Sequence, residues 1–205
     1  MTRIKMCGIK RIADVEAANT CRPEYVGFVF APESKRFVSP QTAKALKQAL
    51  DKEIQAVGVF VDAPLEEVSS LLKEGIIDLA QLHGSEGEAY IRSLKEQTNK
   101  PVIKAFRMNA LGDKINETLS AIEQSSADFV LLDSKAGCGE VFEWGMIETV
   151  QRPYFLAGGL DISNVSTAIE KLQPYAVDVS SGIETDGVKD KDKMEAFVTL
   201  VRENR

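Results

Sequence analysis

The chain has 205 residues, of which 44% are hydrophobic and 27% are charged, and its formal net charge is −6. This length predicts one domain, residues 1–205, that can bury a core without disulfides or metals. The sequence has no basic stripe, which argues against nucleic acid as a partner, because phosphate backbones are bound by clustered Lys and Arg.

The chain has three cysteines and one histidine, and both counts restrict its chemistry. The spacing of Cys7, Cys21 and Cys138 matches no zinc pattern, so free thiols in a reducing compartment, the cytoplasm, are expected. The single histidine, His83, excludes a metal site built from two histidines, and we expect neither a metal nor a cofactor. No apolar run approaches the ~18–20 residues that cross a membrane, and the N-terminal segment lacks the apolar stretch of a signal peptide, so no membrane partner is expected.

Short apolar segments rich in β-branched residues recur along the chain and predict eight strands. They are Ile4–Met6, Tyr25–Phe30, Ile54–Val61, Asp78–Leu82, Val102–Phe106, Asp128–Leu132, Tyr154–Ala157 and Ala176–Val179. Their spacing of roughly 25 residues is the length of a strand plus a helix. This alternation predicts an α/β fold, and eight units are the number that closes a (β/α)8 TIM barrel.

Helix signals lie between the predicted strands. The predicted starts are Ser39 before Pro40, Ser85 with Glu88 in a capping-box pattern, and Asp161. The apolar face of the last predicted helix consists of Met194, Phe197, Val198 and Val201. A doubly wound open sheet is the alternative fold, but the first strand is not followed by the Gly-rich loop that binds dinucleotides.

In a barrel of this kind the active site lies at the C-terminal ends of the strands. The candidate residues are therefore those that follow each predicted strand, within the loop in the case of the second strand. They are Cys7-Gly8, Ser34-Lys35-Arg36, Asp62, His83-Gly84, Arg107, Asp133, Gly158-Gly159 and Ser180-Ser181-Gly182.

Two glycine-containing loops follow the seventh and eighth predicted strands, where barrels frequently bind phosphate. Gly158 and Gly159 lie in the first loop, and Ser180, Ser181 and Gly182 lie in the second. Glycine lets backbone N–H groups approach an anion closely, and serine hydroxyls add donors. Each loop alone is equally well read as a tight turn, but the pair together favours a phosphate site.

Cys7 and Asp133 are the candidates for proton transfer. Cys7 is either a small buried hydrophobe or a reactive thiolate, whose pKa Lys5 or Lys10 would lower. The sequence does not say which lysine faces the thiol. Asp133 is either an acid or base at the end of its strand or a helix cap.

Two further residues carry alternative readings. Arg36 is either a solvated surface charge or a residue that binds a substrate carboxylate through two nitrogens of its guanidinium. His83 is a structural histidine by its local pattern, and it is also counted among the candidate substrate-binding residues. Asp178, within the eighth predicted strand, is expected to be structural.

Blocks of sequence in the same order along nearly the whole chain resemble those of phosphoribosylanthranilate isomerases. They are Lys5–Ile9, Ser34–Pro40, Gly58–Asp62, Gln81–Gly84, Leu131–Asp133, Leu156–Leu160, Val177–Glu184 and Gly187–Asp190. Each block alone is weak, and together they are specific.

The resemblance implies an Amadori rearrangement of a phosphosugar arylamine in tryptophan biosynthesis, without a cofactor. It implies that Cys7 is the general base, that Asp133 is the general acid, and that Arg36 holds the anthranilate carboxylate. It also implies a phosphate site at the two glycine-containing loops. The chain is expected to be a monomer or a homodimer. The segment Ser134–Trp144 departs from the family pattern, because it is shortened and has Glu140-Val141 where Lys-Thr is common. Since that loop would cover the substrate, loop closure is the property in question.

Other functions fit the residues less well. Metal-dependent pentulose-phosphate epimerases need two histidines, and the next synthase of the same pathway uses a lysine–glutamate arrangement on a longer chain. The related isomerase of histidine synthesis uses two aspartates, where this chain has Cys7 and Asp133. A barrel that binds a phosphorylated metabolite without catalysis would need the phosphate loops but not this pair.

Overall fold

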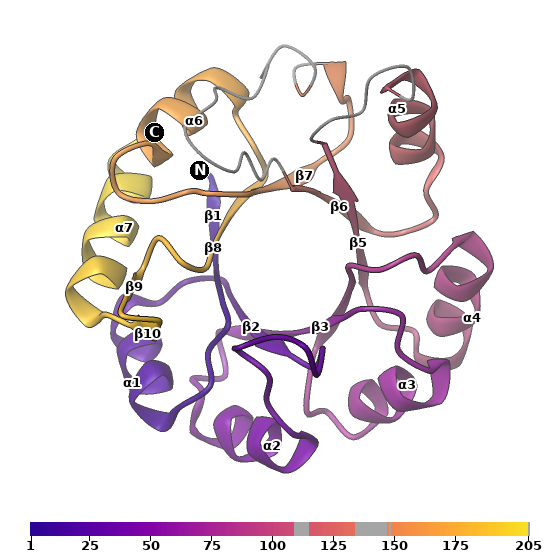
Figure 1. Cartoon of the computed structure of the whole chain (residues 1–205), viewed down its shortest axis with the longest axis horizontal. Coiled ribbons are helices and arrows are strands. Elements are labelled where there is room, and N and C mark those ends of the chain that lie inside the picture. The colour runs from indigo at the N-terminus through magenta and orange to yellow at the C-terminus, as the bar shows by residue number, and fades with distance from the viewer. Residues whose placement is uncertain (109–114, 134–146, 148, 205) are drawn as a thin grey trace.

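The computed structural model describes residues 1–108, 115–133, 147 and 149–204. Eight parallel strands form a closed barrel in the order β1 to β8, and β8 pairs with β1 (Figure 1). Their bounds are β1 Arg3–Cys7, β2 Tyr25–Val29, β3 Gln55–Phe60, β4 Leu79–Leu82, β5 Val102–Arg107, β6 Phe129–Asp133, β7 Tyr154–Ala157 and β8 Ala176–Val179. All eight predicted strands are confirmed within one residue at each end, and the open-sheet alternative is wrong because the sheet closes.

Helices surround the barrel on its outer face (Figure 1). Their bounds in the described residues are α1 Ile12–Cys21, α2 Pro40–Ala49, α3 Leu65–Lys73, α4 Glu88–Thr98, α5 Ile115–Gln124, α6 Val165–Leu172 and α7 Lys191–Glu203. The strands are buried between the barrel interior and these helices, which is why they read as continuous apolar runs rather than as alternating ones. No helix of the described residues has the length and apolar character needed to cross a membrane.

Aromatic side chains fill the N-terminal end of the barrel. The Phe155 ring packs against Tyr25, Phe129 and Tyr175 at centroid distances of 5.3, 5.7 and 5.6 Å. The Arg3 guanidinium lies 4.4 Å above the Tyr175 ring. Each such aromatic pair adds about 0.5–1.5 kcal/mol beyond its buried area. This packing closes one end of the barrel, and polar side chains gather at the other end.

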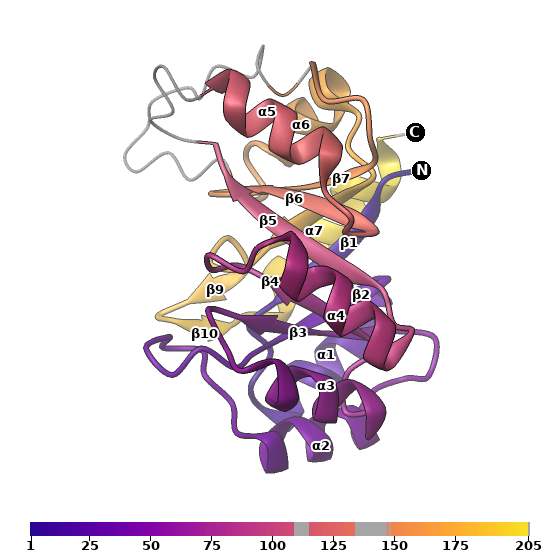
Figure 2. The same ribbon diagram turned by 90° about the vertical axis from the view of Figure 1, so that its right-hand side faces the viewer.

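A short hairpin that the sequence reading missed follows β8. Strands β9, Glu184–Thr185, and β10, Val188–Lys189, pair antiparallel across Asp186 and Gly187. Both turn residues have positive φ, 53° and 76°, as a two-residue hairpin turn of type I′ requires. Figure 2 shows this hairpin at one end of the barrel and the two chain termini at the other.

One of the three predicted helix caps is confirmed, and two are wrong. Ser39 caps α2, since its side chain accepts a hydrogen bond from the Thr42 N–H. The cap position of α4 is Gly87, because the N–H and hydroxyl of Ser85 both donate to Asp62, 2.6 and 2.7 Å away. The cap position of α6 is Asn164 rather than Asp161. In both errors the side chain bonds elsewhere than to the helix: Ser85 bonds Asp62 in the loop after β3, and Asp161 accepts from Ser163 in its own loop.

Candidate active site

Cys7 ends β1 at the C-terminal end of the barrel, which we call the mouth, where Asp133 ends β6 and Val179 ends β8. The Cys7 thiol lies against β2, and a methyl group added to Gly27 would lie 2.8 Å from its Sγ. The Cys7 carbonyl oxygen accepts a hydrogen bond of 3.1 Å from the Ser180 hydroxyl. The thiol is therefore close to β2, and the Cys7 backbone is held from the end of β8.

A buried ion pair lies beside Cys7 inside the barrel. The ammonium of Lys5, which is 0% exposed, is 2.9 Å from both carboxylate oxygens of Asp178. The adjacent strands bring the two residues into register. Lys10 instead points to the surface, where its ammonium bonds the Lys35 carbonyl oxygen at 3.3 Å. Of the two candidate lysines, Lys5 is the one that acts on the thiol, and Asp178 pairs with it from within β8.

The charges around Cys7 oppose one another. Burial raises the pKa of the Cys7 thiol and the Asp178 carboxylate adds to this, whereas Lys5 and Lys189 lower it. Lys5 lowers the pKa as expected, but the net shift is upward, so the pKa of the thiol is not brought below its ordinary value in the protein without substrate. The two cations limit the effect of burial without outweighing it, because the thiol lies in a largely dehydrated position.

His83 joins Asp133 to the barrel interior. Its Nε2 lies 3.3 Å from Oδ2 of Asp133, and its Nδ1 lies 3.1 Å from the side-chain amide nitrogen of Gln81. Gln81 in β4 and His83 just after it are two residues apart, so their side chains share the face that points into the barrel. If the Gln81 amide donates to Nδ1, the neutral imidazole carries its proton on Nε2 and donates it to Asp133. His83 is thus in contact with the candidate acid, a contact that the sequence did not predict.

Arg36 forms a two-pronged ion pair with a carboxylate that the sequence reading did not select. Its Nε and Nη2 lie 2.7 and 2.6 Å from Oε1 and Oε2 of Glu184. The ammonium of Lys189 lies 2.7 Å from the same Oε1 and also bonds the Ser180 carbonyl oxygen at 2.9 Å. Burial raises the pKa of Glu184, but the bonds and charges of Arg36 and Lys189 outweigh it and hold the pKa at about 2.

The two candidate phosphate loops lie side by side. Gly182, after β8, forms a parallel bridge with Asp161, after β7. The Ser180 hydroxyl donates to the Cys7 carbonyl oxygen, and a phosphate donor at Ser180 stays a prediction. Ser181 is exposed. The structure therefore brings Gly158-Gly159 and Ser181-Gly182 to one part of the mouth.

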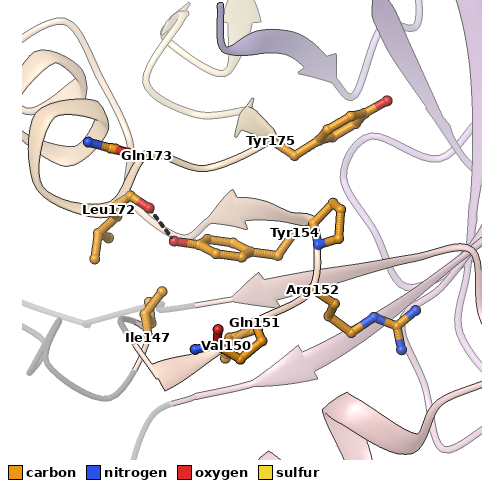
Figure 3. Close-up of a pocket in the computed structure, with 9 residues that line it drawn as sticks. Ile147, Val150, Gln151, Arg152, Tyr154, Leu172, Gln173 and Tyr175 are labelled. Carbon is orange, nitrogen blue, oxygen red and sulfur yellow. Dashed lines mark hydrogen bonds between the residues drawn. The ribbon is translucent and has the colours of Figure 1, made fainter.

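Two cavities differ in their relation to these residues. One of about 500 Å³ opens beside His83 and is also lined by Asp62, Glu86 and Lys104. The other, of about 400 Å³, lies at the closed end of the barrel, where the Tyr154 hydroxyl donates to the Leu172 carbonyl oxygen at 2.6 Å (Figure 3). Only the first belongs to the mouth.

Some of the predicted features lie in residues that the structure does not describe. Cys138 and the segment 134–144, with its departure from the family pattern, lie outside the described residues. Among the described residues, Cys7 and Cys21 are free thiols. No group of three or more His, Cys, Asp or Glu side chains that could hold a metal ion occurs in the part of the chain that the structure covers.

Comparison with known proteins identifies the family. Residues 4–200 match the family model described as N-(5'phosphoribosyl)anthranilate (PRA) isomerase. An N-(5'-phosphoribosyl)anthranilate isomerase of Endomicrobium trichonymphae is 44% identical over 98% of this chain and 99% of its own.

Solved structures agree with this match. The phosphoribosyl anthranilate isomerase of Thermotoga maritima has a TM-score of 0.88 and 34% identity, covering 99% of this chain and 100% of its own. A complex of such an isomerase with reduced 1-(o-carboxyphenylamino)-1-deoxyribulose 5-phosphate has a TM-score of 0.86 and 33% identity, covering 99% and 100%. A further structure, described as monomers generated from the dimeric Thermotoga maritima enzyme, has a TM-score of 0.83 and 32% identity, covering 98% and 99%. The chain belongs to the N-(5'-phosphoribosyl)anthranilate isomerase family.

Proposed function

We propose that this chain isomerises N-(5'-phosphoribosyl)anthranilate to 1-(2-carboxyphenylamino)-1-deoxyribulose 5-phosphate, with Asp133 as general acid and Cys7 as general base. The observation that carries the proposal is the placement of these two side chains on different strands of one mouth, Cys7 at the end of β1 and Asp133 at the end of β6. A barrel that only binds a phosphorylated metabolite has no need of this pair.

Asp133 opens the ribose ring in the first step. The bond between the anomeric carbon and the ring oxygen breaks, and its electron pair goes to the oxygen, which takes the proton of Asp133. The lone pair of the arylamine nitrogen forms the C=N bond of an iminium ion. The acid must therefore be protonated when substrate binds. The imidazole of His83, 3.3 Å from Oδ2 of Asp133, helps to orient this acid.

Cys7 then removes the proton on the sugar carbon next to the iminium. The electrons of that C–H bond form a carbon–carbon double bond, and those of the C=N bond return to nitrogen. The positive nitrogen makes the C–H bond acidic enough for a thiolate base. Lys5 supports the thiolate electrostatically. The resulting enolamine is protonated at the former anomeric carbon and loses its hydroxyl proton, which yields the ketone.

Substrate binding is divided between two sides of the mouth. Arg36 holds the anthranilate carboxylate, and the backbone around Gly158-Gly159 and Ser180-Ser181-Gly182 holds the phosphate. Ser180 contributes by holding Cys7. The small-molecule partner is a phosphosugar arylamine. The chain forms one domain, acts in the cytoplasm, and is a monomer or a homodimer.

The test is turnover of freshly prepared N-(5'-phosphoribosyl)anthranilate, followed by the change in anthranilate-type fluorescence. The wild-type chain should turn it over, and Cys7→Ala and Asp133→Asn should each lower the rate by ~10² or more. The control is Cys21→Ala, which changes a free thiol on α1. A folded wild-type chain without turnover would leave a phosphate-binding barrel as the better interpretation.

A further inference from the structure

Glu184 lies between two cations at the mouth. Its two carboxylate oxygens bind Arg36 at 2.7 and 2.6 Å, and one of them also binds Lys189 at 2.7 Å. The side chains differ in exposure, 30% for Arg36 against 7% for Glu184 and 2% for Lys189. A ligand that enters the mouth therefore meets the guanidinium of Arg36, whereas Glu184 and Lys189 lie behind it.

The geometry of the contact leaves one edge of the guanidinium unused. A guanidinium can bind carboxylates in two-pronged fashion along its side, through Nε and one terminal nitrogen, or along its end, through both terminal nitrogens. Glu184 takes the side edge through Nε and Nη2. Nη1 of Arg36 forms no hydrogen bond with any residue that the structure describes. The end edge is thus the one left for a second carboxylate.

The aliphatic part of Arg36 is fixed as well. Gly8, directly after Cys7, has φ +83°, and a methyl group added there would lie 2.3 Å from Cδ of Arg36. The Arg36 chain therefore crosses the backbone next to the base without space for a side chain beneath it. Its position relative to Cys7 is set by Gly8 at one end and by Glu184 at the other.

The charge of this group also matters. Arg36 and Lys189 contribute two positive charges and Glu184 one negative charge, so the group has a net charge of +1, which a single carboxylate would neutralise. Without Glu184, Arg36 would lose the two bonds that orient it, and Lys189 would become an uncompensated buried cation.

We propose that Glu184 is a positioning residue that makes the site selective for arylamines with an ortho carboxylate, by holding Arg36 along its side edge so that its end edge faces the substrate. Lys189 supports this by fixing Glu184 to the Ser180 carbonyl oxygen. This inference rests on the proposed function, in which Arg36 binds the anthranilate carboxylate. The opposite possibility is that Glu184 competes with the substrate for Arg36, which predicts the opposite effect of its removal.

The experiment compares two ligands that differ only in the carboxylate. One is reduced 1-(o-carboxyphenylamino)-1-deoxyribulose 5-phosphate, and the other is the same molecule with a plain phenylamino group. Their dissociation constants are measured by fluorescence titration for the wild-type chain, Glu184→Gln and Glu184→Asp. Glu184→Asp keeps the charge of the group but shortens the side chain, so it tests position where Glu184→Gln fails to fold. The matched control is Glu24→Gln, since Glu24 pairs with Arg202 at 2.6 Å near the chain termini.

Both Glu184 variants should weaken binding of the carboxylated ligand about tenfold or more, with a smaller loss for the uncarboxylated one, so that selectivity falls. Glu24→Gln should keep the wild-type selectivity. An unchanged or increased selectivity in the folded Glu184 variants would overturn the inference. Arg36→Met separates this from a failure of the proposed function. If Arg36→Met keeps the selectivity, the proposed carboxylate site is wrong, whereas a loss in Arg36→Met alone contradicts only the role of Glu184.

Discussion

Replacing Lys5 with methionine tests the electrostatics beside the base. The substitution keeps the length of the side chain and removes an ammonium that is 0% exposed and bonded to both oxygens of Asp178 at 2.9 Å. Asp178 would then be a buried carboxylate without its counter-charge. Breaking a buried pair from one side costs about 3–5 kcal/mol in the free energy of unfolding. At about 2–4 °C per kcal/mol for a chain of this size, Tm should fall by roughly 6–20 °C.

The double variant Lys5→Met with Asp178→Leu separates stability from chemistry. It removes both charges and leaves apolar side chains of similar volume, so most of the lost stability should return. The Cys7 thiol, however, still lacks the ammonium that lowers its pKa more than the Asp178 carboxylate raises it. Activity should therefore remain low in a stable protein.

The assays are thermal unfolding and the pH dependence of Cys7 alkylation, measured with Cys21→Ala and Cys138→Ala in the background so that Cys7 is the one cysteine left. Alkylation of both variants should require a higher pH than in the parent chain. A Lys5→Met chain as stable as the parent, or with the same alkylation profile, would refute the account of the buried pair.

Three further results are expected. Gly27→Ala should lower kcat, because the new methyl group would lie 2.8 Å from Sγ of Cys7, and a wild-type kcat in this variant would show that the thiol has room to move. The pKa of Glu184 is about 2 in the folded chain against an ordinary value of 4.5, so its contribution to stability is present above pH 4.5 and is lost as pH falls toward 2. Measured by urea denaturation, the free energy of unfolding of Glu184→Gln should accordingly be lower than that of wild type at pH 6, and this difference should shrink on acidification. A difference independent of pH would contradict this. His83→Gln, whose amide can still donate to Asp133, should keep more activity than His83→Ala, with kcat rather than KM changing, and equal kcat values for the two would remove His83 from the acid.

The strands and the position of the candidate acid and base were predictable from sequence. Each strand is buried on both faces and therefore forms a continuous apolar run, and a parallel barrel places the residue after each run at one end. Cys7 and Asp133 could be selected by that rule alone. The closure of the barrel was predictable because the runs recur eight times, which is the number of strands in such a barrel.

The interactions between strands were not predictable in the same way. Nothing local distinguishes Lys5 from Lys10, because the choice depends on which one faces the barrel and pairs with Asp178 across β1 and β8. Ser85 has the pattern of a helix cap, yet it bonds Asp62, a residue that is distant in sequence.

Glu184 and Lys189 were not predicted as site residues, although the dipeptide between them indicates a hairpin. The Asp186-Gly187 dipeptide is the usual signal for a two-residue hairpin, which would have placed Glu184 and Lys189 opposite each other. The contact of Glu184 with Arg36 spans 148 residues of sequence and needs the closed barrel.

The most direct test of the central claim is the single-turnover rate with substrate carrying deuterium on the sugar carbon that loses its proton. In the wild-type chain, deuterium should slow the reaction, since Cys7 breaks that bond. In folded Cys7→Ala, the single-turnover rate should be lower than in the wild-type chain by a factor of ~10² or more. A folded Cys7→Ala chain that turns over at the wild-type rate would contradict the assignment of Cys7 as the base.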